Sequence, residues 1–190
     1  LAMAAQVRVT SPGTELLLDA QAGKELKVIY FGARLADADL LSVSAAGTCG
    51  CNAYPAYGMQ CPSEAALGVT HSDGSLATEL LVETVSQSIE NGAQITRVRL
   101  KDTVYPFYVT ICWRAYQDVD MIETWTEIEN LEKKPVTLTR FDSGFLPVRR
   151  GEVWLSHLTG TWANEGRLVQ EPLNAGVKLI KNKDGVRNSH

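Results

Sequence analysis

The sequence predicts an all-β domain, a two-sheet antiparallel β-sandwich, from three observations. Strand-length runs recur along the chain, turn residues separate them at short intervals, and several runs alternate between apolar and polar side chains. The chain has 190 residues, of which 45% are hydrophobic and 21% charged, and a chain of this size buries roughly 70% of its unfolded surface. We therefore expect a single domain over residues 1–190 that folds without metals or disulfides.

Turn-forming sequences set the limits of the expected strands. They are rich in glycine, proline, asparagine and aspartate, whose backbone preferences favour tight turns. They occur at residues 11–13, 22–24, 72–74, 91–92, 118–120, 132–135, 150–151 and 183–185. Such spacing is typical of sandwiches and barrels.

The clearest strand is Phe107–Tyr116, in which every second residue is apolar. Successive side chains of a strand point to opposite faces, so this pattern buries one face and does not suit a helix. The runs 93–101 and 121–130 alternate in the same way, the first with basic residues on its polar face and the second with glutamates. Paired across a solvated sheet, such charges contribute about 0.2 to 1 kcal/mol each. Residues 75–90 fit a helix or a strand, and the Asn91-Gly92 that follows favours a strand.

Charge and hydropathy exclude several classes of partner. The net charge is −4, whereas nucleic acids and anionic membranes bind basic surfaces. No run approaches the roughly 20 apolar residues that a transmembrane helix needs. We expect no nucleic acid and no membrane, and a neutral or polar small ligand fits better.

The cysteines are Cys49, Cys51, Cys61 and Cys112. The first three could hold a zinc ion, or one of the close pair could form a disulfide with Cys61. Neither spacing is that of a strong zinc motif, so free thiols are the preferred interpretation and no metal site is assigned.

Two patterns resemble catalytic groups without forming an active site. Glu127 and Glu129 share one face of an expected strand, but retaining glycosidases hold two carboxyl groups about 5 to 5.5 Å apart across a sugar, and an exposed strand offers no such cleft. His71-Ser72-Asp73 has the residue types of a hydrolytic triad, yet neighbours on a turn point in different directions. We assign no catalytic residue.

The tryptophans divide between the core and the surface. Trp113 and Trp154 are expected in the core. Trp125, on the acidic strand, and Trp162, beside Asn164 and Glu165, are candidates for stacking on a sugar ring or for a domain interface.

From about Tyr54 onward the chain resembles the amino-terminal domain of family 36 glycoside hydrolases, the retaining α-galactosidases. The matching segments follow one another in family order: 54–58 (YPAYG), 66–74 (ALGVTHSDG), 105–109 (YPFYV), 125–128 (WTEI), 132–138 (EKKPVTL), 156–165 (SHLTGTWANE) and 185–190 (GVRNSH). The resemblance implies a β-supersandwich of the galactose mutarotase-like kind, cut from a longer polypeptide in which a catalytic (β/α)8 barrel follows residue 190.

In that family the nucleophile and the acid/base are aspartates of the barrel, and no cofactor is used. The resemblance therefore implies a non-catalytic domain of an enzyme that removes terminal α-linked galactose from oligosaccharides. The parent protein is an enzyme on this interpretation, and this fragment alone is not.

Family members are often tetramers in which a loop of this domain reaches a neighbour's substrate pocket, and the matching loop here is 57–66. Its substrate-proximal candidates are Tyr57, Gly58, Cys61, Ser63 and Glu64. Cys61 and Ser63 stand where many members have an Asp and an Arg, so a charged pair that could hydrogen-bond sugar hydroxyls is missing. Asn164 likewise replaces a commoner arginine.

Two other functions remain open: an independent carbohydrate-binding β-sandwich module, and a structural domain of an inactive homologue. The expected partners are the barrel of the same polypeptide, an α-galactoside bound by the parent enzyme, and further copies in a homo-oligomer. The first ten residues are not an intact secretory signal, so a bacterial cytoplasmic, periplasmic or secreted location is not distinguished.

Overall fold

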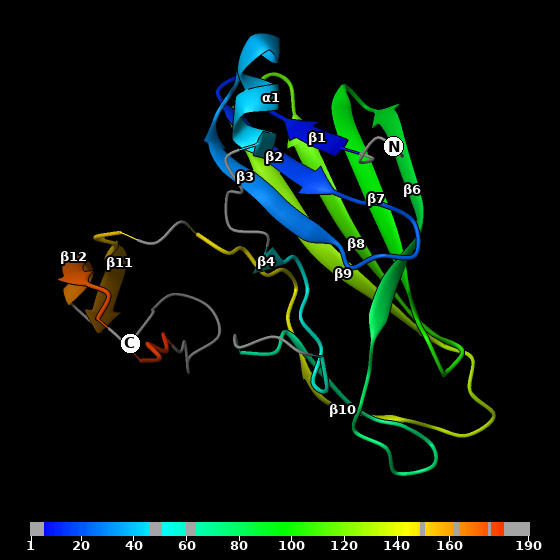
Figure 1. The fold of residues 1–190 in the computed structure, drawn as a ribbon. Coiled ribbons are helices and arrows are strands. Elements are labelled where there is room, and N and C mark those ends of the chain that lie inside the picture. The colour runs from blue at the N-terminus through cyan, green and yellow to red at the C-terminus, as the bar shows by residue number, and fades with distance from the viewer. Residues whose placement is uncertain are drawn as a thin grey trace. The chain divides into compact units, whose positions relative to one another are not determined.

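The computed structural model describes residues 6–45, 51–59, 64–148, 151–161, 164–174 and 176–180 (Figure 1). The elements are almost all β-strands in antiparallel pairs, which confirms the predicted all-β class. Contacts divide the chain into two compact units, Leu1–Val148 and Arg149–His190. The single domain expected over residues 1–190 stays a prediction.

The larger unit contains two four-stranded sheets. The first has the order β1-β2-β3-β4, formed by Gln6–Thr10, Thr14–Asp19, Lys27–Ala33 and Cys51–Asn52. The second has the order β6-β7-β8-β9, formed by Leu80–Glu90, Ala93–Asp102, Phe107–Tyr116 and Ile122–Asn130. A separate pair joins β5 (Leu67–Thr70) to β10 (Thr137–Phe141).

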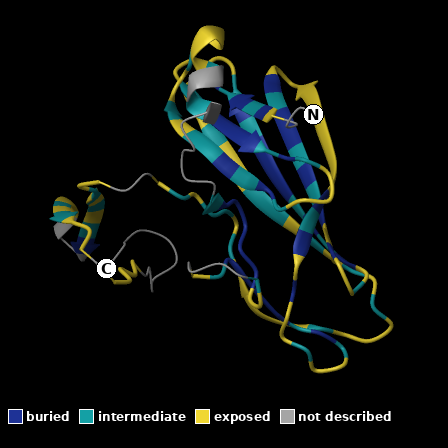
Figure 2. Cartoon of the chain, viewed as in Figure 1, coloured by how far each residue is buried: buried dark blue, intermediate teal, exposed yellow. Residues whose placement is uncertain are grey.

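The core lies between the inner faces of the two four-stranded sheets, as a sandwich requires. Figure 2 shows runs of buried residues along β2, β7 and β8. One cluster joins apolar side chains of both sheets: Val7, Val9, Leu16, Leu18 and Val28 from the first, and Val98, Leu100, Phe107, Val109, Ile111 and Trp113 from the second.

The strands predicted from alternation are confirmed. Strand β8 has the predicted bounds, and its apolar face from Phe107 to Ala115 is buried. The segment left between helix and strand is β6, although it begins at Leu80. Asn91 and Gly92 both have positive φ, 49° and 78°, the backbone geometry of the hairpin turn that Asn-Gly favours.

Helix α1 (Asp37–Ala45) has no counterpart among the predicted elements. Glu15 on β2 is fully buried, and its carboxylate accepts hydrogen bonds from Arg8 Nε at 2.5 Å and from the Leu35 N–H at 3.0 Å. Arg8 Nη1 also donates to Asp37 at 2.7 Å. This network fixes the entry to the helix through contacts between residues distant in sequence, which a local pattern cannot show.

Two predictions about single residues are wrong. Cys51 is disulfide-bonded, whereas free thiols were preferred. Cys112 is a free, buried thiol, and burial, together with Glu127, raises its pKa to about 12. Trp154, expected in the core, begins strand β11 and is 61% exposed.

The smaller unit contains the hairpin of β11 (Trp154–Thr161) and β12 (Asn164–Pro172). In this unit Glu171 pairs with Lys178 at 2.8 Å. Among the described residues of the whole chain, no helix has the length and apolar content to cross a bilayer.

Glutamine side chains of β6, β7 and the loop after β8 cap the free edge of β1. Gln87 Nε2 donates to the Arg8 carbonyl at 2.8 Å, and Gln117 Nε2 donates to the Thr10 carbonyl at 2.8 Å. The Thr10 N–H donates to Gln94 Oε1 at 3.0 Å. Because these main-chain groups are satisfied, the edge offers less template for pairing with another chain.

We expect the double variant Gln94→Met, Gln117→Met to associate more strongly than the wild type, because both main-chain groups of Thr10 lose their partners. Light scattering over a concentration series measures the mass. Gln170→Met, on β12 in the smaller unit, is the matched control. Equal masses for all three proteins would contradict the capping role.

Candidate functional site

A cavity of about 590 Å³ opens beside the turn that carries Tyr57 and Gly58. The β5–β10 pair forms part of its wall, and its lining consists of Pro55, Ala56, Tyr57, Gly58, Met59, Glu64, Ala65, Gly68, Val69, Leu76, Thr139 and Arg140. Tyr57 is 60% exposed, so its ring is open to a ligand. The volume is typical of small-molecule sites.

The two charged lining residues, Glu64 and Arg140, are paired with each other, and Arg140 also pairs with Asp142 outside the lining. Arg140 Nη1 lies 2.6 Å from Glu64 Oε1, and Arg140 Nη2 lies 3.1 Å from Asp142 Oδ2. Hydrogen bonds to Asp142 and Glu64 raise the pKa of Arg140. An exposed aromatic ring beside a fixed guanidinium and a carboxylate offers both the apolar and the hydrogen-bonding contacts that a sugar needs.

Gly58 is required by its backbone and by its packing. Its φ is +99°, and an added Cβ would lie 2.7 Å from Ala77 Cα. Main-chain hydrogen bonds hold the turn on both sides, from Tyr57 N to the Leu67 carbonyl at 2.8 Å and from Thr78 N to the Tyr57 carbonyl at 3.0 Å. The segment before β6 therefore supports the turn directly.

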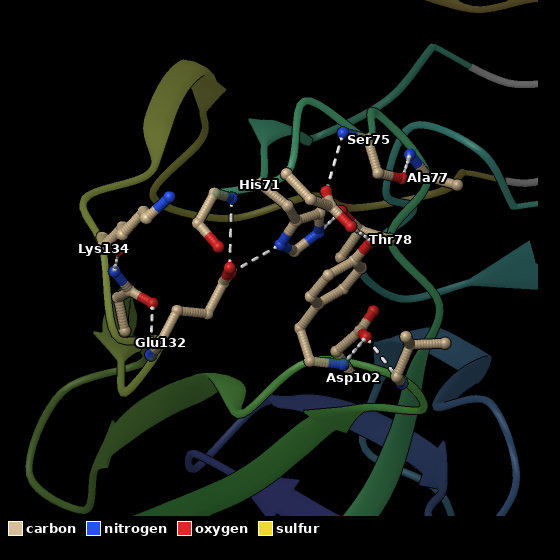
Figure 3. Close-up of polar contacts among 12 residues, drawn as sticks. His71, Ser75, Ala77, Thr78, Asp102, Glu132 and Lys134 are labelled. Carbon is tan, nitrogen blue, oxygen red and sulfur yellow. Dashed lines mark hydrogen bonds and ion pairs between the residues drawn. The ribbon is translucent and has the colours of Figure 1, made fainter.

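A buried polar cluster centred on His71 contacts that segment through Thr78 (Figure 3). His71 Nδ1 is 2.7 Å from Glu132 Oε1, and its Nε2 is 2.9 Å from Thr78 Oγ1. The second oxygen of Glu132 accepts the Ser72 N–H at 3.1 Å. His71 is 3% exposed and Thr78 1% exposed, so the cluster joins buried loop residues that lie far apart in sequence.

Aromatic rings enclose the imidazole. Tyr105 stacks on His71 with 3.8 Å between ring centroids and 10° between planes, and Phe107 meets it edge-on at 5.7 Å. Tyr105 is fixed in turn by its N–H, which donates to Asp102 at 2.7 Å, and by its hydroxyl, which donates to Asp73 at 2.8 Å.

The electrostatics of the cluster favour an ionised Glu132. Burial alone would raise the pKa of this carboxyl, but the hydrogen bonds from His71 and Ser72 outweigh burial and hold the pKa below its ordinary value. A carboxylate only accepts hydrogen bonds, which places a proton on His71 Nδ1.

The Thr78–His71–Glu132 order matches a hydrolytic triad, but the surroundings do not fit hydrolysis. Thr78 is buried, and its N–H is bonded to Tyr57. The next N–H, of Glu79, donates to Asp102 at 2.8 Å. Neither of these two amides is available to stabilise an oxyanion, which acyl transfer needs. The cluster therefore suits a structural role.

The structure brings some of the predicted site residues together. Tyr57, Gly58 and Glu64 line the cavity. Cys61, Ser63 and Trp162 lie outside the described residues, and Asn164 and Glu165 begin β12, where only their backbone is described. Arg140, Thr139 and Leu76 line the cavity without having been predicted. His71 had been interpreted as part of a turn with Ser72 and Asp73, and no local pattern pointed to Glu132.

Trp125 lies elsewhere, on the outer face of β9. Its Nε1 donates to Glu127 Oε1 at 3.0 Å, and the Arg114 guanidinium lies 5.3 Å from its ring centroid. Glu129 on the same strand pairs with Arg99 at 2.6 Å. These contacts agree with the expected solvated, charge-paired sheet face and give Trp125 no place in the cavity lining.

Comparison with known proteins identifies a match over most of the chain. The family model of the glycosyl hydrolase family 36 N-terminal domain matches residues 24–190. No curated protein matches the chain.

Solved structures share the fold. The GH36 α-galactosidase AgaA from Geobacillus stearothermophilus superposes with a TM-score of 0.78 at 20% identity, over 97% of this chain and 30% of that one. AgaB from the same organism superposes with a TM-score of 0.77 at 19% identity, over 100% of this chain and 30% of that one. The α-galactosidase from Lactobacillus brevis superposes with a TM-score of 0.71 at 18% identity, over 92% of this chain and 28% of that one. This chain thus spans less than a third of the length of the structures it matches.

We expect Gly58→Ala to destabilise the protein more than Gly74→Ala does. Gly74 also has positive φ, +89°, but an added Cβ there meets nothing within 4 Å. Gly74→Ala should therefore cost only the left-handed backbone, about 1 to 2 kcal/mol, and Gly58→Ala about 1 to 3 kcal/mol more for the contact with Ala77. Urea unfolding of both variants measures the difference, and equal losses would refute the close packing.

The stability of the protein should also depend on the ionisation of Glu132. A carboxyl whose pKa is lowered in the folded state stabilises the fold above its ordinary pKa, here 4.5, and that contribution is lost as the pH falls through the folded pKa. We expect the free energy of unfolding to fall below pH 4.5 and Glu132→Gln to remove part of the fall.

Asp73, Glu90 and Asp120 also have lowered pKa values. The difference between wild type and Glu132→Gln, measured by urea titration across the acid range, is therefore the informative quantity. A constant difference in the free energy of unfolding at every pH would show that Glu132 does not cause the loss of stability in acid.

Proposed function

The chain belongs to the family of glycosyl hydrolase family 36 N-terminal domains, and on that premise we propose that it is the non-catalytic N-terminal domain of a retaining α-galactosidase. Its parent enzyme would hydrolyse terminal α-galactosides at paired aspartates of a (β/α)8 barrel that follows residue 190. The observation that carries the proposal is the family match over residues 24–190. The fold shared with structures described as α-galactosidases supports it.

The domain's own contribution is the Tyr57–Gly58 turn and the cavity beside it. In the proposed assembly the loop from Tyr57, with Gly58, Cys61, Ser63 and Glu64, lies close to the substrate of a neighbouring subunit in a homo-oligomer. The exposed ring of Tyr57 supports this assignment. Glu64 is the one acidic group among the described lining residues, so the cavity is suited to binding and not to a two-carboxylate cleavage.

A second candidate, an independent carbohydrate-binding module, is favoured by the same cavity. A cavity lined by both an exposed aromatic ring and the planar guanidinium of Arg140 would suit a sugar without any barrel. A module of this kind binds a galactoside by itself, whereas a supporting domain does so only within the parent enzyme.

We expect the 190-residue chain alone neither to hydrolyse an aryl α-galactoside nor to bind galactose tightly in calorimetry. The parent enzyme should hydrolyse the same substrate, and Tyr57→Ala in it should raise KM about tenfold, the loss of about 1.4 kcal/mol of binding. Tyr116→Ala is the matched control, since Tyr116 bonds to Glu123 on the outer sheet face.

Tight galactose binding by the isolated chain would favour the module. Hydrolysis by the isolated chain, or a coding sequence without a barrel and its aspartates, would rule out the proposed role.

A further inference from the structure

We propose that His71, held by Glu132 and bonded to Thr78, is a positioning residue that sets the place of the Tyr57–Gly58 turn at the cavity. The role of this turn near a substrate rests on the function proposed above. The positioning itself rests on the contacts within the larger unit.

Thr78 links the histidine to the turn. Its hydroxyl lies 2.9 Å from His71 Nε2, while its main-chain N–H donates to the Tyr57 carbonyl at 3.0 Å. The preceding residue, Ala77, is the one that a Cβ on Gly58 would strike at 2.7 Å. The same short segment therefore meets the imidazole on one side and the turn on the other.

His71 is held in one orientation, so it can fix the position of Thr78. Both oxygens of Glu132 are engaged, by the imidazole at 2.7 Å and by the Ser72 N–H at 3.1 Å. Tyr105 stacks on the ring at 3.8 Å and is held by Asp73 and Asp102. The orientation of the imidazole is thus set by charge, hydrogen bonds and ring packing together.

The turn needs this support because open space lies on two of its sides. The cavity of about 590 Å³ borders Tyr57, Gly58 and Met59. A second cavity of about 490 Å³ borders Gly58, Met59 and Thr78. The hydrogen bond from Thr78 N holds the Tyr57 carbonyl between these two cavities and, through it, the direction of the exposed ring.

The decisive substitution is Thr78→Val, which removes the hydroxyl and leaves the main-chain N–H in place. His71 Nε2 then loses its buried partner, and the segment is expected to shift away from the imidazole. Thr78→Ser is the matched control, because it keeps the hydroxyl. A purely packing role for the side chain would affect Ser more than Val, since Val keeps the volume.

Amide hydrogen exchange on the 190-residue chain gives the first readout. In Thr78→Val we expect exchange at residue 78 to accelerate about tenfold, the scale of one lost hydrogen bond, while amides of β8 such as Val109 keep their wild-type rates. Thr78→Ser should resemble the wild type. Unchanged exchange at residue 78, or equal acceleration at Val109, would overturn the positioning role.

Steady-state kinetics of the parent enzyme give the second readout, in which Thr78→Val should raise KM several-fold with kcat unchanged. Local opening in exchange together with an unchanged KM would support the positioning of the turn and count against its proximity to substrate. The failure of this inference is thereby separated from the failure of the proposed function.

Discussion

The structure depends on the burial of one continuous apolar face along β8. Phe107, Val109 and Ile111 meet the first sheet across the core, and each fully buried side chain of this size stabilises the fold by about 1.5 to 3 kcal/mol. A slip of one residue in the register of β8 would move this whole set to the outer face. The pairing of β8 with β7 and β9 is therefore fixed, and with it the ends at which the connecting loops gather.

The candidate site forms at one of those ends because the loops there bury polar groups that must find partners. A buried imidazole or carboxylate without a hydrogen bond costs about 1 to 3 kcal/mol or more, and His71, Glu132, Thr78 and Asp102 satisfy one another and the nearby main chain. A fully bonded polar network allows few alternative arrangements. The loops, and with them the Tyr57–Gly58 turn, are consequently held in one geometry.

Alternation predicted the strands because it is a local consequence of core burial, and β8 shows it at every position except Cys112, which is buried although it lies on the opposite face. Long-range contacts could not be predicted in this way. His71 and Glu132 are separated by 61 positions, and helix α1 is fixed by Arg8 and Glu15 across 29 and 20 positions. Tyr57, Gly58 and Glu64 were predicted from the family resemblance and do line the cavity. Arg140 could not be predicted, because the pairing of β10 with β5 brings it there. The exposure of Trp154 shows that the size and apolar character of a side chain do not by themselves predict its burial.

The electrostatics of the two surfaces explain why the loops, and not the broad sheet face, are the better candidate for function. On the outer face, Arg99 joins Glu83 at 2.9 Å to Glu129 at 2.6 Å, and Glu127 accepts the Trp125 N–H, so these charges are already paired across a flat surface. Flat, exposed ion pairs contribute little free energy and enclose no ligand. At the cavity the same residue types surround a recess. The ring of Tyr57 is exposed there, and ion pairs with Glu64 and Asp142 hold the guanidinium of Arg140. Concavity, and not the presence of acidic or aromatic residues, therefore distinguishes the candidate site.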